Sequence, residues 1–126
     1  MKFADIQKAI VERYHIKLDE HSCCWGRTHA HIRERRVCKW HPKNSVQSTF
    51  ELLHEVGHIE TTTSGMRRAE EEFFATKWAI DRAKECGMEI PEKIIEDYQK
   101  YINMELDRGK RRGGKGYPEK LDLKGE

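Results

Sequence analysis

Two histidines four residues apart, His54 and His58, flank a glutamate in the pattern His-Glu-x-x-His. Residues at this spacing lie on one face of a helix, one turn apart, so both imidazoles can bind a single metal ion. Glu55 would then lie close enough to a metal-bound water molecule to act as its general base. Two ligands and a base on one helical turn are typical of zinc hydrolases. The alternative is a core helix that carries two incidental histidines.

The residues around this motif favour a buried helix. Ser48 and Glu51 have the spacing of a capping box, in which the serine caps the helix start and the glutamate bonds back to it. The apolar residues that follow would bury one side of the helix: Phe50, Leu52, Leu53, Val56 and Ile59. Gly57 is a poor helix former, but its small size lets another backbone or a ligand approach the motif closely.

A catalytic zinc site usually has three protein ligands and one open position, so a third ligand is needed. The segment from Arg67 onward predicts a second helix, which Gly87 would end in the C-cap role. One face of this helix combines a single carboxylate with small side chains: Glu72, Ala75, Thr76, Ala79 and Ala83. We therefore take Glu72 as the third ligand. If Glu72 were instead a surface acid like Glu70, Glu71 would be the candidate.

Together the two segments resemble the ImmA/IrrE family of metallopeptidases, a branch of the gluzincins. Its members carry His-Glu-x-x-His on one helix and Glu-x-x-Ala-(Asn or Asp)-x-(Phe or Trp)-Ala on the next. Here the second motif is Glu72-x-x-Ala75-Thr76-x-Trp78-Ala79, and the resemblance covers roughly residues 25 to 86. It departs from the family at Thr76, where the usual Asn or Asp supports a zinc-binding histidine. The threonine hydroxyl can still accept one hydrogen bond in that role.

The resemblance implies one zinc ion per chain, held by His54, His58 and Glu72, with Glu55 as the catalytic base. It also implies hydrolysis of a peptide bond in a protein substrate, which in this family is often a DNA-bound repressor of a phage or mobile element. A non-proteolytic, metal-containing binding or regulatory module is the alternative of a different class. The intact Glu55 argues against it, because a purely structural zinc site does not need a base there.

The four cysteines raise the question of a second metal site. Cys38-x-x-His41 together with Cys23 or Cys24 would supply a structural zinc site, although the spacing is not that of a standard zinc finger. Such a site would suit a zinc-stabilised nucleic-acid-binding protein. We favour the alternative in which the cysteines are thiols, as expected for a chain in the reducing cytoplasm.

We expect an α+β fold, with one small zincin-like domain over residues 1–107. An amphipathic helix over residues 3–16 precedes a short antiparallel sheet or hairpin, with strands at 28–32 and 36–40 around a charged turn. The metal-binding helix and the Glu72 helix follow. A C-terminal helix then begins at Pro91.

Two segments are candidates for substrate binding. In the related family the edge strand of the small sheet can pair with an extended substrate. We assign this role to Val37, Cys38, Lys39 and Trp40. His31 lies on a strand face that could border the cleft, and Tyr98 or Tyr101 could reach it from the C-terminal helix as an oxyanion donor. The alternative for these three side chains is ordinary packing.

The composition is that of an ordinary polar protein, with 24 basic and 22 acidic residues. No apolar run approaches the length of a membrane span, and the N-terminus lacks the apolar core of a signal peptide, so we expect a cytoplasmic protein. Residues 108–126 are rich in glycine, lysine and arginine and predict a flexible basic tail. Such a tail could contact nucleic acid through its phosphates, but we favour a solubilising role.

Overall fold

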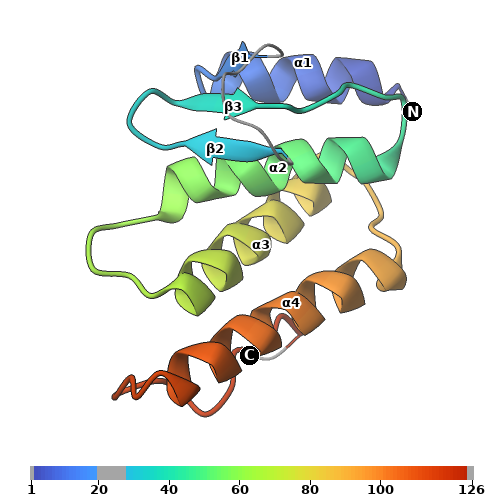
Figure 1. The fold of residues 1–126 in the computed structure, drawn as a ribbon. Coiled ribbons are helices and arrows are strands. Elements are labelled where there is room, and N and C mark those ends of the chain that lie inside the picture. The colour runs from blue at the N-terminus through green and yellow to red at the C-terminus, as the bar shows by residue number, and fades with distance from the viewer. Residues whose placement is uncertain (1, 20–27, 125–126) are drawn as a thin grey trace.

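The computed structural model describes residues 2–19 and 28–124, and within them it has four helices and one three-stranded sheet (Figure 1). The elements in chain order are α1 (Phe3–Arg13), β1 (Lys17–Asp19), β2 (His29–His31), β3 (Arg36–Cys38), α2 (Val46–Thr61), α3 (Arg68–Glu85) and α4 (Glu92–Arg111). The expected α+β class is therefore confirmed. Over these described ranges, no helix is long and apolar enough to cross a membrane.

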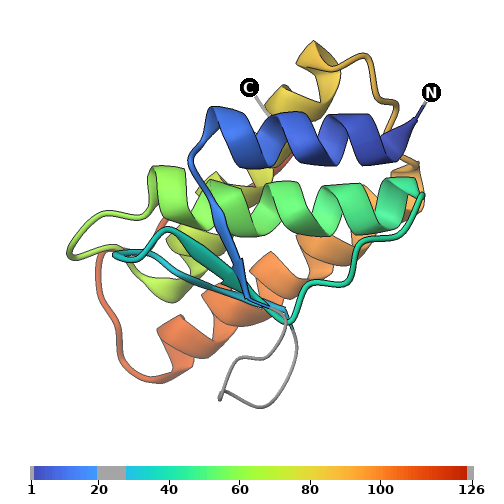
Figure 2. The ribbon, with the colours of Figure 1, turned by 90° about the horizontal axis from the view of Figure 1, so that it is seen from above.

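Helix α2 is the central element of the core. Its side chains Phe50, Leu52, Leu53 and Val56 are all 0% exposed, as the apolar pattern predicted. Figure 2 shows α1 running beside α2, and in Figure 1 the sheet lies on one side of α2 while α3 and then α4 follow on the other. A helix packed from several sides holds its side chains in fixed positions, which a binding site requires.

Helix α2 begins three residues earlier than the sequence suggested. Ser45 is its N-cap, and the Ser45 hydroxyl accepts a hydrogen bond from the Ser48 amide at 3.1 Å. The Ser48 hydroxyl donates to the His41 carbonyl at 2.9 Å, and the Ser48 carbonyl accepts from the Trp40 indole at 2.8 Å. The predicted cap at Ser48 is therefore wrong, because Ser48 is a buried helical residue that ties α2 to the chain before it.

Helix α3 approaches α2 most closely at Gly57. A Cβ atom at this position would lie 2.5 Å from the Ala75 carbonyl oxygen, so only glycine allows the two backbones to meet here. The small face predicted for α3 is indeed buried, with Ala75, Ala79 and Ala83 all 0% exposed. Gly87 follows the helix end in the left-handed region, at φ 73°, as expected for a glycine in the C-cap role.

The sheet has the strand order β1-β3-β2. The expected hairpin is present, since β2 pairs antiparallel with β3. Strand β1 was not anticipated; it pairs parallel with β3, so the sheet is mixed and not purely antiparallel. Because β3 lies between two strands, the prediction that Val37, Cys38, Lys39 and Trp40 form the edge strand is wrong. Val37, Cys38 and Trp40 are buried, the Lys39 amide donates into β1, and β1 and β2 take the edge positions.

The segment after α4 packs back onto the helices. Leu123 is buried, and its amide donates to the Gln99 side chain at 2.7 Å. The Arg67 guanidinium, at the start of α3, lies 4.3 Å from the centre of the Tyr117 ring. Where a flexible basic tail from residue 108 was expected, the structure has a helix that continues to Arg111 and a docked segment beyond it. A few apolar and aromatic side chains anchor this segment despite its glycine-rich, basic composition.

Candidate metal centre

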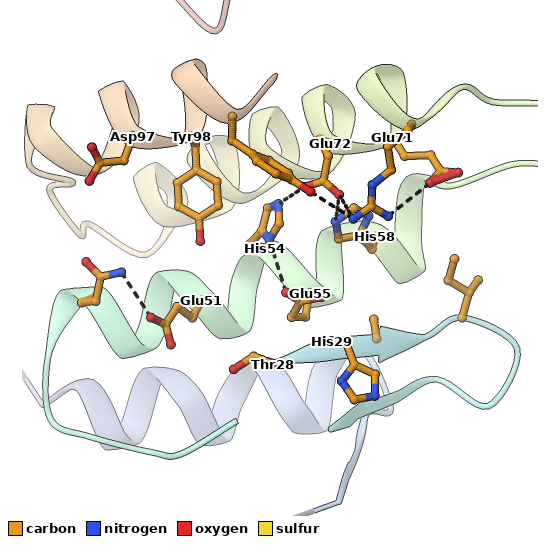
Figure 3. Close-up of a pocket in the computed structure, with 15 residues that line it drawn as sticks. Thr28, His29, Glu51, His54, Glu55, His58, Glu71, Glu72, Asp97 and Tyr98 are labelled. Atoms are coloured by element: carbon orange, nitrogen blue, oxygen red, sulfur yellow. Dashed lines mark hydrogen bonds and ion pairs between the residues drawn. The ribbon is translucent and has the colours of Figure 1, made fainter. Parts of the chain in front are cut away.

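Three side chains converge between α2 and α3 (Figure 3). His54 and His58 come from successive turns of α2, with ring centroids 4.7 Å apart. The two carboxylate oxygens of Glu72, from α3, lie 3.2 Å from His54 Nε2 and 3.0 Å from His58 Nε2. The structure thus brings together the three residues predicted as ligands. We call His54, His58 and Glu72 the helical centre.

The register of α3 distinguishes Glu72 from Glu71. The Glu72 side chain is 4% exposed and faces α2, whereas that of Glu71 is 26% exposed and lies 4.0 Å from the Arg68 guanidinium. Arg68 also lies 3.5 Å from a Glu72 oxygen, so it offsets part of the negative charge on that carboxylate. Glu71 borders the pocket without joining the three converging residues.

The polar atoms of the helical centre could hold a metal ion. His54 Nε2 is buried and makes no hydrogen bond among the described residues, although a Glu72 oxygen lies 3.2 Å away. In a tetrahedral site with bonds of about 2.0–2.1 Å, donor atoms lie roughly 3.3–3.4 Å apart, close to the separations found here. Two imidazole nitrogens and one carboxylate oxygen also form a donor set that zinc accepts.

The electrostatics of the helical centre favour a cation between the two helices. Burial disfavours the charged imidazole of His54, but the Glu55 and Glu72 carboxylates outweigh it and raise the pKa of His54 to about 9. Burial likewise disfavours the ionised form of Glu72, yet His54 and His58 hold the pKa of its carboxyl well below the usual range. The carboxylate is therefore ionised across the physiological pH range, where it can pair with a protonated histidine or bind a metal ion.

Glu55 lies on the side of α2 that faces β2, away from α3 (Figure 3). Its carboxylate is 3.4 Å from His54 Nδ1, whereas Nε2 of the same ring is the atom that approaches Glu72. The Glu55 side chain is 12% exposed and lines the pocket, where it can meet water. This is the position expected for a base, beside the three converging residues and outside their group.

A pocket of about 570 Å³ opens over the helical centre. Tyr98 and Tyr101, which were predicted to approach the cleft from the C-terminal helix, both line it. The Tyr98 ring packs 4.7 Å from the His54 ring, and burial together with the nearby Glu55 carboxylate raises the pKa of the Tyr98 phenol. Tyr98 therefore keeps its hydroxyl proton. Tyr101 accepts a hydrogen bond from Arg68 at 3.2 Å.

Several pocket residues were not predicted from the sequence to lie at the site. They share only their position on the pocket wall: Thr28, Gln47, Glu51, Arg68 and Asp97. They come from the flank of β2 and from α2, α3 and α4. No local pattern marks such residues, because they meet only when separate elements pack.

Two predicted roles differ from what the structure shows. The Thr76 hydroxyl donates to the Glu72 carbonyl one turn back, at 2.7 Å. The Thr76 side chain is fully buried and bonds within its own helix, and the described hydrogen bonds do not join it to a histidine. His31 is not among the described residues that line the pocket, whereas its neighbour on the strand, His29, is.

Cys38 lies with different partners from those the sequence suggested. Cys23 and Cys24 fall outside the described residues, and His41 is exposed. Cys38 is instead grouped with His29 and His31, and one donor atom from each lies within 4.8 Å of the others. The alternating histidines on a strand are visible in the sequence, but their pairing with Cys38 depends on strand register.

No protein-family model, curated protein or solved structure matches this chain. What can be said of function therefore comes from the site itself. It consists of a buried group of two histidines and a glutamate that could hold a metal ion, a second carboxylate beside it, and an open pocket.

Proposed function

We propose that the protein is a zinc-dependent metallopeptidase of the ImmA/IrrE type, with one catalytic zinc ion per chain. The observation that carries this proposal is the position of Glu55, which adjoins the helical centre and faces the pocket without joining the ligand group. A purely structural metal site does not need a base at this position. When bound, zinc would polarise the carbonyl of a substrate and lower the pKa of a coordinated water molecule towards neutrality.

The proposed reaction is hydrolysis of a peptide bond, with Glu55 as general base and then general acid. Glu55 accepts a proton from the attacking water as the water oxygen bonds to the carbonyl carbon. It then passes this proton to the amide nitrogen, the carbon–nitrogen bond breaks, and an amine and a carboxylate leave. Partial exposure lets Glu55 meet water, while the packed helix around it keeps the carboxylate in place.

Tyr98 is suited to stabilise the charge that develops on the carbonyl oxygen. It lines the same pocket, and its ring is held against His54 and Phe50. Burial and the surrounding carboxylates raise the pKa of its phenol, so the hydroxyl remains a hydrogen-bond donor at neutral pH. A donor fixed in advance near the reacting carbonyl lowers the barrier without any reorganisation cost.

An extended peptide would bind along β2. This strand is at the edge of the sheet, and Thr28, Ala30 and Ile32 in and beside it line the pocket next to α2. Backbone pairing with an edge strand gives affinity with little demand on the substrate's own sequence. We therefore assign substrate pairing to residues 28–32 in place of residues 37–40. The substrate class we propose is a protein segment in an extended conformation.

The decisive test separates metal binding from turnover at Glu55. Glu55→Gln should keep zinc at the wild-type stoichiometry, measured by atomic emission after dialysis. It should lose hydrolysis by roughly 10²–10⁴-fold, the usual contribution of a general base. Cleavage is followed by mass spectrometry on a library of unstructured peptides. Glu51→Gln is the matched control, since Glu51 is another pocket carboxylate on the same helix and should be dispensable.

Two outcomes would count against the proposal. A zinc-loaded Glu55→Gln protein that cleaves at the wild-type rate would remove Glu55 from the mechanism. A zinc-loaded wild-type protein that cleaves no peptide in the library would favour the non-proteolytic binding module instead.

A further inference from the structure

His29, His31 and Cys38 lie together on one face of the sheet. His29 and His31 are two residues apart on β2, so their side chains point to the same face. Cys38 is the register partner of His29 on β3, and directly paired residues share a face at the closest cross-strand spacing. The two imidazole rings are 5.1 Å apart, and the three donor atoms lie within 4.8 Å of one another. We call these three residues the sheet cluster.

The sheet cluster is separate from the helical centre. Ala30 and Val37, which alternate with the cluster residues along their strands, pack into the hydrophobic core that surrounds α2. Alternation therefore turns the cluster side chains towards the other face of the sheet, although His29 also borders the pocket. Figure 3 shows the His29 ring extending from β2 on the side away from His54 and His58. Strand β2 thus lies between the two groups.

An ion pair beside the sheet cluster offsets the charge of a nearby arginine. Arg36 is the register partner of His31 and shares its face. The Arg36 guanidinium lies 3.9 Å from a carboxylate oxygen of Asp19, which offsets its charge. Asp19 is in turn the register partner of Cys38 on β1, so a carboxylate-bearing residue flanks the cysteine. Cys38 itself is fully buried, and the two histidines are partly buried.

We propose that the sheet cluster is a second metal site, which binds a borderline-soft divalent cation such as Zn²⁺ through two imidazole nitrogens and the Cys38 thiolate. Imidazole and thiolate are the donors that select zinc and related transition metals. Binding releases the thiol proton of Cys38 to solvent and leaves both imidazoles neutral. Tetrahedral donors with bonds of about 2.0–2.3 Å lie roughly 3.3–3.6 Å apart, and the three donor atoms here lie within 4.8 Å of one another, so small side-chain movements can close the cluster.

The bound cation would join β2 to β3. Each of these strands has three residues, and such short pairings are marginal in water without further support. Metal–ligand bonds that form only in the folded state add directly to folding stability. Because β2 also borders the pocket of the helical centre, the second metal would fix one wall of that pocket. This role is structural and goes beyond the proposed peptidase function, because none of the three side chains acts on the scissile bond.

Cobalt(II) is the probe for this site, because charge transfer from a thiolate ligand to cobalt gives a near-ultraviolet absorption band. The helical centre has no sulfur donor, so the band reports on the sheet cluster. The His54→Ala/His58→Ala variant should bind about one Co²⁺ per chain and show the thiolate band. Adding Cys38→Ser should abolish both the band and the bound ion. Adding Cys86→Ser should change neither, since Cys86 is an exposed free cysteine and serves as the matched control.

A second set of variants covers the case in which the double-histidine variant does not fold. Wild-type protein should bind about two Co²⁺ per chain, and Cys38→Ser, His29→Ala and His31→Ala should each bind about one and lose the thiolate band. A folded wild-type protein without a thiolate band would overturn the proposal. So would a band that survives Cys38→Ser, because the sulfur ligand would then be another cysteine. These outcomes do not depend on whether the protein cleaves peptides, so the metal-site proposal and the peptidase proposal can fail separately.

Discussion

The helical centre and the sheet cluster are two candidate ligand groups on very different scaffolds. The helical centre takes its residues from helices of 16 and 18 residues, which meet at the backbone contact between Gly57 and Ala75. The sheet cluster takes its residues from two strands of three residues, one of them at the sheet edge. The comparison teaches that long packed helices set donor atoms in place before a metal arrives, whereas short strands would gain order from the metal itself.

The donor spacings of the helical centre already suit a bound ion. The Glu72 oxygens lie 3.0 and 3.2 Å from the histidine nitrogens, close to the spacing around a tetrahedral zinc ion, and helices of 16 and 18 residues hold them there. A site whose donors are already near their bound positions loses less free energy in rearrangement when the ion binds. We therefore expect the helical centre to bind zinc more tightly than the sheet cluster.

The largest expected effect comes from removing one ligand of the helical centre. Glu72→Ala should weaken zinc binding at this centre by at least about 100-fold, because even residues that only support a ligand contribute about 10–100-fold to metal affinity. Glu71→Ala is the matched control and should retain zinc, since Glu71 points to Arg68 and not to the histidines. Competition with a chromophoric chelator measures both affinities, in a Cys38→Ser background that removes the sheet cluster.

The result that would break this assignment is the reverse order of the two variants. If Glu71→Ala lost zinc and Glu72→Ala kept it, the register of α3 in solution would differ by one residue from that described here. If neither variant lost zinc, the third ligand would have to come from outside α3.

The next largest effect concerns the helix contact that makes the helical centre rigid. Gly57→Ala places a Cβ atom 2.5 Å from the Ala75 carbonyl oxygen, so α2 and α3 must move apart. We expect a loss of roughly 1–3 kcal/mol in the free energy of unfolding, as for other overpacked cores. Intrinsic helix propensity acts in the opposite direction, since alanine is favoured over glycine by about 1 kcal/mol. Urea unfolding of the metal-free protein decides between them, and an unchanged or raised midpoint would contradict the close contact.

The same contrast explains which features the sequence could predict. His54, Glu55, His58 and the small face around Glu72 follow from helical periodicity, which is local and repeats over several turns. The glycine that lets the helices meet was also recognisable from its position inside the motif. The exact helix start was not, because Ser45 and Ser48 are both serines and only the contacts of Ser48 with the preceding chain decide between them.

The sheet depended on contacts that a local pattern does not contain. The hairpin was predicted, although its turn lacks glycine. Arg35 takes the left-handed position in this turn, at φ 53°. Its guanidinium donates to the Tyr14 carbonyl at 2.6 Å and pairs with Glu60. Strand β1 pairs with β3 over a long sequence separation, and that pairing moved β3 from the edge to the centre. The C-terminal segment was misjudged for a related reason, since composition alone does not show that Leu123 finds a buried place beside Gln99.

The smallest expected effect is the number of protons that zinc displaces from the helical centre. Glu55 and Glu72 raise the pKa of His54 from 6.5 to about 9 against the effect of burial, so His54 carries a proton at pH 7 in the metal-free protein. That imidazolium stabilises the metal-free fold fully below about pH 6.5, and the stabilisation is lost as pH rises through about 9.

Zinc requires a neutral imidazole, so binding at pH 7 should release about one proton from His54, and zinc affinity should rise with pH until that proton is gone. Calorimetric titration in two buffers with different ionisation enthalpies counts the protons, again in the Cys38→Ser background so that the Cys38 thiol does not contribute. A value near zero at pH 7 would mean that the carboxylates do not hold a proton on His54, and the preorganisation that sets the helical centre apart would then lie in geometry alone.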